Sequence, residues 1–269
     1  MPEPIPLITL LTDFGLQDHY VGVMKGVIYQ INPQARIVDL CHNVRPQDIL
    51  QAAFLLRVSY SYFPKRTIHV VVVDPEVGTK RRPILVSTES YYFIAPDNGV
   101  LSYIYQTEPV GEIREITASH YFLHPVSQTF HGRDIFAPVA AWLSRGVAPS
   151  SCGELITDYK RFTIPVPTLV KEDILLGRIL YIDRFGNLVS NITRKDFTEH
   201  LDKSPGKRFV IRIADRNLTR ICHSYTEGSE GELIAIFGSS DFLEFSINKG
   251  NAAKTLGLQI GAEVLCKVA

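Results

Sequence analysis

The sequence lacks the features that mark several large classes of protein. No apolar run among its 269 residues approaches the roughly 20 that a membrane-spanning helix needs, so we expect no membrane association. Residues 1–4 have no basic flank leading into an apolar stretch and do not resemble a secretory signal peptide. The four cysteines lie far apart without a Cys-x-x-Cys pair, which argues against a zinc ribbon or redox motif and favours a reduced, cytoplasmic protein.

The chain also lacks an excess of either charge. Its 28 Lys and Arg residues balance 28 Asp and Glu residues, and each half of the chain is close to neutral. Nucleic-acid binding through a broad basic surface is therefore disfavoured. The familiar G-x-x-x-x-G-K-[ST], G-x-G-x-x-G, G-x-S-x-G and H-E-x-x-H motifs are missing as well, so their phosphate, nucleophile and zinc sites are not expected.

The first part of the chain alternates strand and helix patterns. Short apolar or β-branched runs predict strands, and apolar residues spaced three and four apart predict helices between them. We expect strands at residues 7–11, 36–40, 67–73, 84–87 and 91–95, and helices at 18–31, 46–57 and 134–143. This order indicates an α/β domain with a largely parallel or mixed sheet.

The pattern changes after the proline-rich stretch at residues 163–167. Alternating strands dominate from there, at residues 209–213, 232–237, 243–247 and 264–268, with little helical pattern. We therefore expect a domain boundary here, with an α/β domain at residues 1–165 and an all-β domain at residues 166–269.

Candidate functional side chains gather at the predicted strand ends of the first domain. Asp13, Asp74 and Asp97 each follow a strand, the place where ligands bind in open α/β sheets. Singly, each carboxylate is equally well explained as a turn or cap residue. Together with Arg81 and His131, Asp74 could form a cluster that holds and polarises a water molecule for general base chemistry.

The second domain has polar loops of its own. Asp183 and Asn187 lie in one loop, which suits an amino group and a purine edge but is also typical of an ordinary turn. Residues 238–241 and 248–253 follow two further strands.

These segments taken together resemble the S-adenosyl-L-methionine (SAM) hydroxide adenosyltransferases, relatives of the SAM-dependent fluorinase and chlorinase. The resemblance lies in residues 12–26, 74–82, 96–102, 129–138, 183–192 and 239–253, in order along nearly the whole chain. It implies an α/β domain followed by a β-barrel-like domain. It also implies a homotrimer, with each active site between the first domain of one subunit and the second domain of the next.

The resemblance implies a role for each candidate residue. Asp74, Arg81 and His131 match the catalytic residues that handle water. The substrate-binding positions comprise Asp13 for the ribose hydroxyls, Asp18 and Asp183 for the methionine ammonium, Asn187 and the backbone of Asn251 and Ala252 for the adenine, and Ser239 or Ser240 for the methionine carboxylate.

The implied reaction is hydrolysis of SAM to adenosine and L-methionine by attack of water on the ribose C5′. The sulfonium leaves as a neutral thioether, so neither a general acid nor a metal or cofactor is needed, and either Asp74 or His131 could accept the water proton. A halogenase is the close alternative, but an ionised Asp74 would repel a halide. A SAM or adenosine sensor with little turnover is the alternative from another class.

Two residues depart from the family pattern. Glu76 and Asp241 replace glycines that are usual in relatives. If either position needs a positive φ, the side chain costs of order 1 kcal/mol and could reshape its loop.

Overall fold

The structure, a computed structural model, describes residues 7–203, 206 and 208–268. The chain divides into two compact units, the first ending at Thr163 and the second beginning at Ile164. Residues 1–4, which do not resemble a signal peptide, lie outside the described residues. Within the described residues, no helix has the length and apolar character that crossing a membrane requires.

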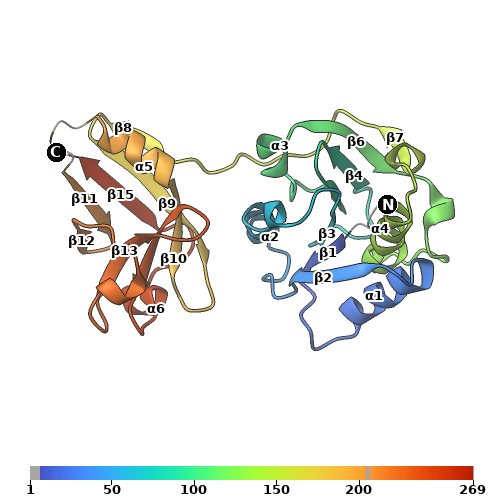
Figure 1. Cartoon of the computed structure of the whole chain (residues 1–269), viewed down its shortest axis with the longest axis horizontal. Helices are drawn as coiled ribbons and strands as arrows, with labels where there is room; N and C mark the ends of the chain where they lie inside the picture. Colours follow the sequence, from blue (N-terminus) through green and yellow to red (C-terminus); the bar gives the residue numbers. More distant parts are fainter. Residues whose placement is uncertain (1–6, 204–205, 207, 269) are drawn as a thin grey trace. The chain divides into compact units, whose positions relative to one another are not determined.

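The first unit is built on a seven-stranded mixed sheet (Figure 1) with the order β2-β1-β3-β5-β4-β6-β7. Its strands are β1 (Leu7–Thr12), β2 (Arg36–Cys41), β3 (Ile68–Val72), β4 (Pro83–Thr88), β5 (Tyr92–Pro96), β6 (Val110–Ile116) and β7 (Gly153–Leu155). Its helices are α1 (Tyr20–Ile31), α2 (Ile49–Arg57), α3 (Ile104–Thr107), α4 (Ala137–Ser144), a π-helix (Gly132–Phe136) and three short 3₁₀ turns (Tyr60–Tyr62, Ser119–Tyr121 and Pro149–Ser151).

The direction of each strand follows from the length of its connection. Helical crossovers through α1 and α2 make β1, β2 and β3 parallel, and β5, which is reached through β4, also pairs with β3 in parallel. A tight turn, in which Thr88 N donates to Tyr91 O at 2.9 Å, forces β4 to run antiparallel to β5, and β6 and β7 continue antiparallel. The prediction of a largely parallel or mixed sheet is confirmed in its mixed form, while β6 and β7 had not been anticipated.

The sheet is covered on both faces because its central strands are apolar on both sides. Val70 and Val72 of β3 pack with α1 and α4 in one large apolar cluster. His69, which alternates with them, faces the other side, where it stacks on Phe93 and contacts Tyr60. Burial of the His69 ring lowers its pKa to about 3, so it packs as a neutral aromatic residue.

The starts of two helices differ from the sequence prediction. Helix α1 begins at Tyr20 rather than at residue 18. Helix α2 begins at Ile49 rather than at Pro46, because Asp48 is its N-cap and accepts a hydrogen bond from Gln51 N. Pro46 lies in the preceding turn, where its fixed φ is equally well accommodated.

Pro138 explains the π-helix that precedes α4. A proline has no N–H to donate to the carbonyl four residues earlier, and its ring clashes with that carbonyl in a regular helix. Here the displaced carbonyl, Asp134 O, instead accepts from Leu123 N at 2.9 Å. The helix expected at residues 134–143 is therefore a π-helix followed by an α-helix, and the irregular turn comes directly after His131.

The second unit is an antiparallel, barrel-like sheet around its own apolar core, as expected (Figure 1). The strand order is β12-β11-β15-β9-β10-β14-β13, with β8 added beside β9. Its strands are β8 (Thr168–Lys171), β9 (Ile174–Ile182), β10 (Leu188–Thr193), β11 (Phe209–Ile213), β12 (Arg216–Leu218), β13 (Leu233–Phe237), β14 (Phe242–Ile247) and β15 (Glu263–Val268). Two short helices, α5 (Arg194–Leu201) and α6 (Ala252–Leu256), and a 3₁₀ turn (Tyr225–Glu227) lie in its loops.

Asp97, one of the three strand-end carboxylates, has a structural role. It is 2% exposed and accepts hydrogen bonds from Arg82 Nε and Nη2 and from Lys160 N. Arg82 also donates to Asp158. Asp97 therefore ties the last segment of the first unit to the end of β5.

Replacing Asp97 should destabilise the first unit. We expect Asp97→Ala to lower the free energy of unfolding by about 2 kcal/mol or more, because it removes a buried carboxylate that is the acceptor for the Lys160 N–H and for a half-buried guanidinium. Glu112→Ala, which breaks an exposed ion pair with Arg114, is the control and should cost less than about 1 kcal/mol. Urea unfolding measures both, and equal costs would contradict the structural role of Asp97.

Candidate active site

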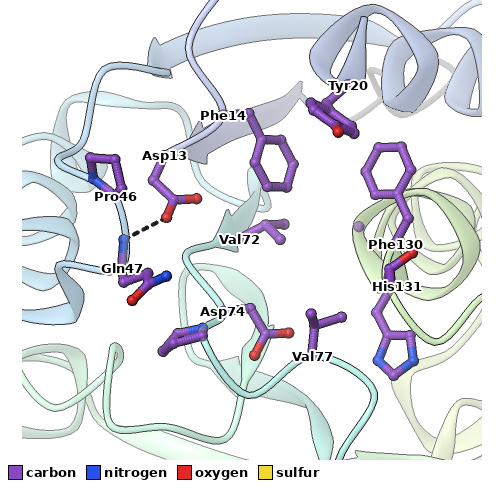
Figure 2. A pocket seen from close by; sticks show the side chains of 13 residues that line it. Asp13, Phe14, Tyr20, Pro46, Gln47, Val72, Asp74, Val77, Phe130 and His131 are labelled. Atoms are coloured by element: carbon purple, nitrogen blue, oxygen red, sulfur yellow. Dashed lines mark hydrogen bonds between the residues drawn. The ribbon is translucent and has the colours of Figure 1, made fainter. Parts of the chain in front are cut away.

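A cavity of about 400 Å³ lies at the carboxyl ends of β1 and β3 in the first unit (Figure 2). Its lining comes from the loop after β1, the turn before α2, the loop after β3 and the segment entering the π-helix. Among the predicted site residues, Asp13, Asp74 and His131 line it. Three stretches far apart in sequence are thus brought to one hollow at the sheet edge.

Asp13 is held in place by two neighbouring segments. Its Oδ2 accepts a hydrogen bond from the backbone N–H of Gln47 at 2.8 Å. The loop that carries it is fixed by His42, whose Nδ1 lies 2.9 Å from Thr12 Oγ1 and whose carbonyl accepts from Gly15 N at 2.7 Å. The carboxylate is therefore oriented before any ligand arrives.

Asp74, Arg81 and His131 form one connected cluster, as the sequence predicted. Arg81 Nε donates to Asp74 Oδ1 at 3.1 Å, and Arg81 Nη2 pairs with Asp74 Oδ2. The same Nη2 lies 3.0 Å from His131 Nδ1. The side chain of Arg81 is 1% exposed, lies behind the cavity wall, and packs on the ring of Phe136 at 5.4 Å.

The guanidinium determines the protonation of its neighbours. Since Arg81 can only donate, His131 Nδ1 must accept, and a neutral His131 then carries its proton on Nε2. Burial, assisted by the charge of Arg81, lowers the pKa of His131 below 6.5, which favours that neutral form. Burial raises the pKa of Asp74, while Arg81 acts against this shift.

The side chains of Arg81 and Arg82 point in different directions. Arg82 points away from the cluster to Asp97 and Asp158. Arg81 is the residue in contact with Asp74 and His131, in agreement with the position that the family resemblance implied.

The loop between Asp74 and Arg81 depends on Gly78 and not on position 76. Gly78 has φ +76, and a Cβ there would lie 2.1 Å from Gln128 O. Glu76 is absent from the described residues with positive φ and forms an exposed ion pair with Lys160 at 3.1 Å. Glu76 therefore does not strain the backbone of this loop, because the positive φ that requires glycine occurs two residues later, at Gly78.

Three aromatic rings line the cavity near Asp13 and were not singled out from the sequence. Phe14, Tyr20 and Phe130 contact one another with ring centroids 5.2 to 5.9 Å apart (Figure 2). Phe14 and Tyr20 follow β1, while Phe130 precedes the π-helix, so no single local motif contains all three. Such faces suit the apolar part of a ligand or a cationic group.

In the second unit, the loop at residues 183–187 packs against the start of α6. Gly186 has φ +87 and a Cβ there would lie 2.1 Å from the Asn251 side chain, while Ala253 N donates to Gly186 O at 2.9 Å. The structure therefore brings Asp183 and Asn187 together with Asn251 and the start of α6.

The carboxylate of Asp183 already has partners within its loop. Its Oδ1 accepts from Phe185 N and Asn187 N, each at 2.9 Å, and its Oδ2 accepts from Asn187 Nδ2 at 2.8 Å. Phe185, in the same loop, is 73% exposed. Asp183 thus shapes the turn, as the simpler interpretation of this loop held, and its remaining lone pairs can still accept from a ligand.

Ser239 and Ser240 lie in the turn between β13 and β14, followed by Asp241. Asp241 has φ +65, so the predicted strain at this position is confirmed. Its carboxylate accepts from Arg194 Nε at 2.7 Å, which links the turn to the start of α5.

Two residues that sequence reasoning missed connect these loops. Tyr225 donates its hydroxyl to the buried Glu244 at 2.9 Å, and Glu244 reaches toward Gly238 at the start of the serine turn. Burial, Glu244 and the charge of Asp183 raise the pKa of Tyr225 to about 12. The sequence signal that could have identified this pair is Glu244, a charged residue inside the otherwise largely apolar strand β14.

Asp18 is not joined to the cavity in this structure. It is exposed and does not belong to the residues that line the hollow. Across the described ranges, no group of three or more His, Cys, Asp and Glu side chains could hold a metal ion.

The fold and this site define a class: a two-domain α/β protein with a small-molecule site at the carboxyl ends of its parallel strands. Comparison with known proteins identifies the family. Residues 8–153 match the SAM hydroxide adenosyltransferase N-terminal domain, and residues 177–265 match the corresponding C-terminal domain. The chain belongs to the SAM hydroxide adenosyltransferase family, which confirms the resemblance seen in the sequence.

Individual relatives resemble the chain over almost its full length. An (R)-S-adenosyl-L-methionine hydrolase from Methanocaldococcus jannaschii is 33% identical over 97% of this chain and 95% of its own. A fluorinase from Nocardia brasiliensis is 26% identical over 98% of this chain and 97% of its own. The crystal structure of an uncharacterized conserved protein from Thermotoga maritima superposes with a TM-score of 0.90 at 36% identity, covering 97% of this chain and all of that one.

Gly78 provides a test of how the loop between Asp74 and Arg81 is held. We expect Gly78→Ala to lower the free energy of unfolding well beyond the roughly 1 kcal/mol of positive-φ strain, because its Cβ meets the Gln128 carbonyl. Gly146→Ala is the matched control, since Gly146 has φ +93 but open space around it. Urea unfolding of both variants measures the difference, and equal losses would show that contact with Gln128 is unimportant.

Proposed function

We propose that this protein hydrolyses SAM to adenosine and L-methionine by in-line attack of water on the ribose C5′. The observation that carries the proposal is the Asp74–Arg81–His131 cluster at the cavity wall, in a chain of the SAM hydroxide adenosyltransferase family. The greater identity to SAM hydrolases than to fluorinases supports water as the nucleophile.

Asp74 is the group that we propose to accept the water proton. His131 Nδ1 is occupied by Arg81 and Nε2 carries the proton, so His131 has no free lone pair for this step. Burial raises the pKa of the Asp74 carboxyl and so makes it a better base, and Arg81 keeps it oriented.

The reaction balances without a further reactant. A lone pair of the water oxygen forms the O–C5′ bond, the C5′–S bond breaks, and its electron pair stays on sulfur as the neutral thioether of methionine. One water proton passes to Asp74 and then to solvent. Because the leaving group departs uncharged, we propose that neither a metal nor a cofactor takes part. The positive charge of Arg81 favours hydroxide character in the attacking water, and its Nη1 is buried without an acceptor within the described part of the chain.

Substrate binding is proposed to use both units. In the first unit, Asp13 accepts from the ribose hydroxyls, supported by its position on the cavity wall. In the second, Asn187 and the Asn251–Ala252 backbone bind the adenine, Asp183 the methionine ammonium, and Ser239 or Ser240 its carboxylate. Asp18 is also proposed for the ammonium, although here it lies outside the cavity lining.

We propose that the protein is a homotrimer whose sites are completed by the second domain of a neighbouring subunit. The presence of ligand-type loops in both units supports this arrangement. The four free thiols support a reducing, cytoplasmic location.

The proposed reaction predicts which product carries the oxygen of water. In ¹⁸O-labelled water the protein should convert SAM to adenosine labelled at the 5′ oxygen, detected by liquid chromatography with mass spectrometry. Asp74→Asn should reduce turnover roughly a hundredfold or more while still binding adenosine. Intact SAM that nevertheless binds would indicate a sensor, and 5′-chloro-5′-deoxyadenosine formed with added chloride would indicate a halogenase.

The protonation states predict the pH dependence. As the pH falls from 6.5, it approaches the lowered pKa of His131 and the raised pKa of Asp74. His131 then becomes cationic beside Arg81, and the Asp74 carboxylate is protonated and loses its charge. We therefore expect kcat/KM to decrease on the acid side. His131→Gln keeps an acceptor for Arg81 but does not titrate, and its acid limb should report Asp74 alone. A rate that rises below pH 6.5 would contradict this assignment.

A further inference from the structure

The turn before α2 contains a residue in a backbone conformation that its side chain disfavours. Asp48 N donates to Arg45 O at 3.0 Å, Pro46 is the second residue of the turn, and Gln47 is the third with φ +66. A proline followed by a residue with positive φ is typical of a type II turn, whose third position is usually glycine or asparagine. The chain keeps a glutamine where the backbone alone favours glycine.

Gln47 differs in its location from the other non-glycine residues that have positive φ. Five non-glycine residues in the described part of the chain have positive φ: Gln47, Arg66, Ala214, Asp241 and Lys249. Of these, only Gln47 lines the cavity (Figure 2). Strained backbone conformations persist where the surroundings or the function require them.

The turn conformation aims the Gln47 backbone at Asp13. In a type II turn the peptide between the second and third residues is turned over relative to a type I turn, so the third N–H points out of the turn. Here it donates to Asp13 Oδ2 at 2.8 Å (Figure 2). Asp13 Oδ1 and the second lone pair of Oδ2 remain available for a ligand.

The Gln47 side chain adds a second polar group beside that carboxylate. Within the described residues it makes no hydrogen bond, and it lies at the cavity wall next to Asp13 (Figure 2). A carboxamide supplies both a donor and an acceptor, which suits a hydroxyl that also donates to a carboxylate.

We propose that Gln47 is a further substrate-binding residue that recognises the ribose together with Asp13. Its backbone N–H orients the Asp13 carboxylate, and its carboxamide hydrogen-bonds one of the two ribose hydroxyls. The inference rests on the proposed function, since it takes the ribose to be bound at Asp13. It explains why a side chain is retained at a position that strains its backbone.

The test is the variant Gln47→Gly, which keeps the turn and its N–H and removes only the carboxamide. Isothermal titration calorimetry would compare adenosine, 2′-deoxyadenosine and 3′-deoxyadenosine. We expect adenosine to bind roughly three- to tenfold more weakly to the variant. One of the two deoxynucleosides should bind the variant and the wild type equally, because the hydroxyl that Gln47 contacts is already missing.

Ala214→Gly is the matched control, because Ala214 also has positive φ, at 52°, but does not line the cavity. It should leave all three dissociation constants unchanged, and neither variant should lower the thermal midpoint. Unchanged binding in Gln47→Gly, or an equal loss for all three nucleosides, would overturn the inference while leaving the proposed function intact. A wild-type protein that binds none of the nucleosides would instead refute the nucleoside site, and this inference with it.

Discussion

The buried guanidinium of Arg81 is the constraint on which the candidate site depends. A charge removed from water must be compensated nearby, and Asp74 supplies the opposite charge through two hydrogen bonds. The same guanidinium forces His131 to act as an acceptor, and so determines which nitrogen holds its proton. One side chain thereby orients the proposed base and also prevents the neighbouring imidazole from competing for the proton.

The fold positions this cluster through two departures from regular structure. The π-helix that Pro138 imposes comes directly after His131, and the positive φ of Gly78 lets the loop carrying Asp74 and Arg81 pass close to Gln128. Both features lie at the carboxyl edge of the sheet, where parallel strands end together. Asp97, at the same edge, has a structural role instead. Its carboxylate oxygens accept hydrogen bonds from Arg82 and Lys160, and these bonds hold the last segment of the first unit in place.

Much of the fold and of the site was predictable from local pattern. Apolar runs identified β1, β3 and β5, and helical spacing identified α1, because burial on a sheet or along a helix imposes its own period. The family resemblance indicated Arg81. Helix starts were less predictable, since Pro46 is equally suited to a turn and to a first helical residue. The aromatic group of Phe14, Tyr20 and Phe130 was missed because its members share no local motif.

The sequence by itself determined the alternation of elements, the change to an all-β second unit, the family, and the residue types available for chemistry. These depend on short-range periodicity and on segments that can be recognised along the chain. Only the tertiary structure decided that Arg82 faces Asp97, that Gln47 adopts a positive φ beside Asp13, and that Tyr225 joins Glu244. Each of these contacts depends on which distant segment of the chain packs next to the side chain. The free energy of such a contact depends on burial and geometry, which local sequence pattern does not encode.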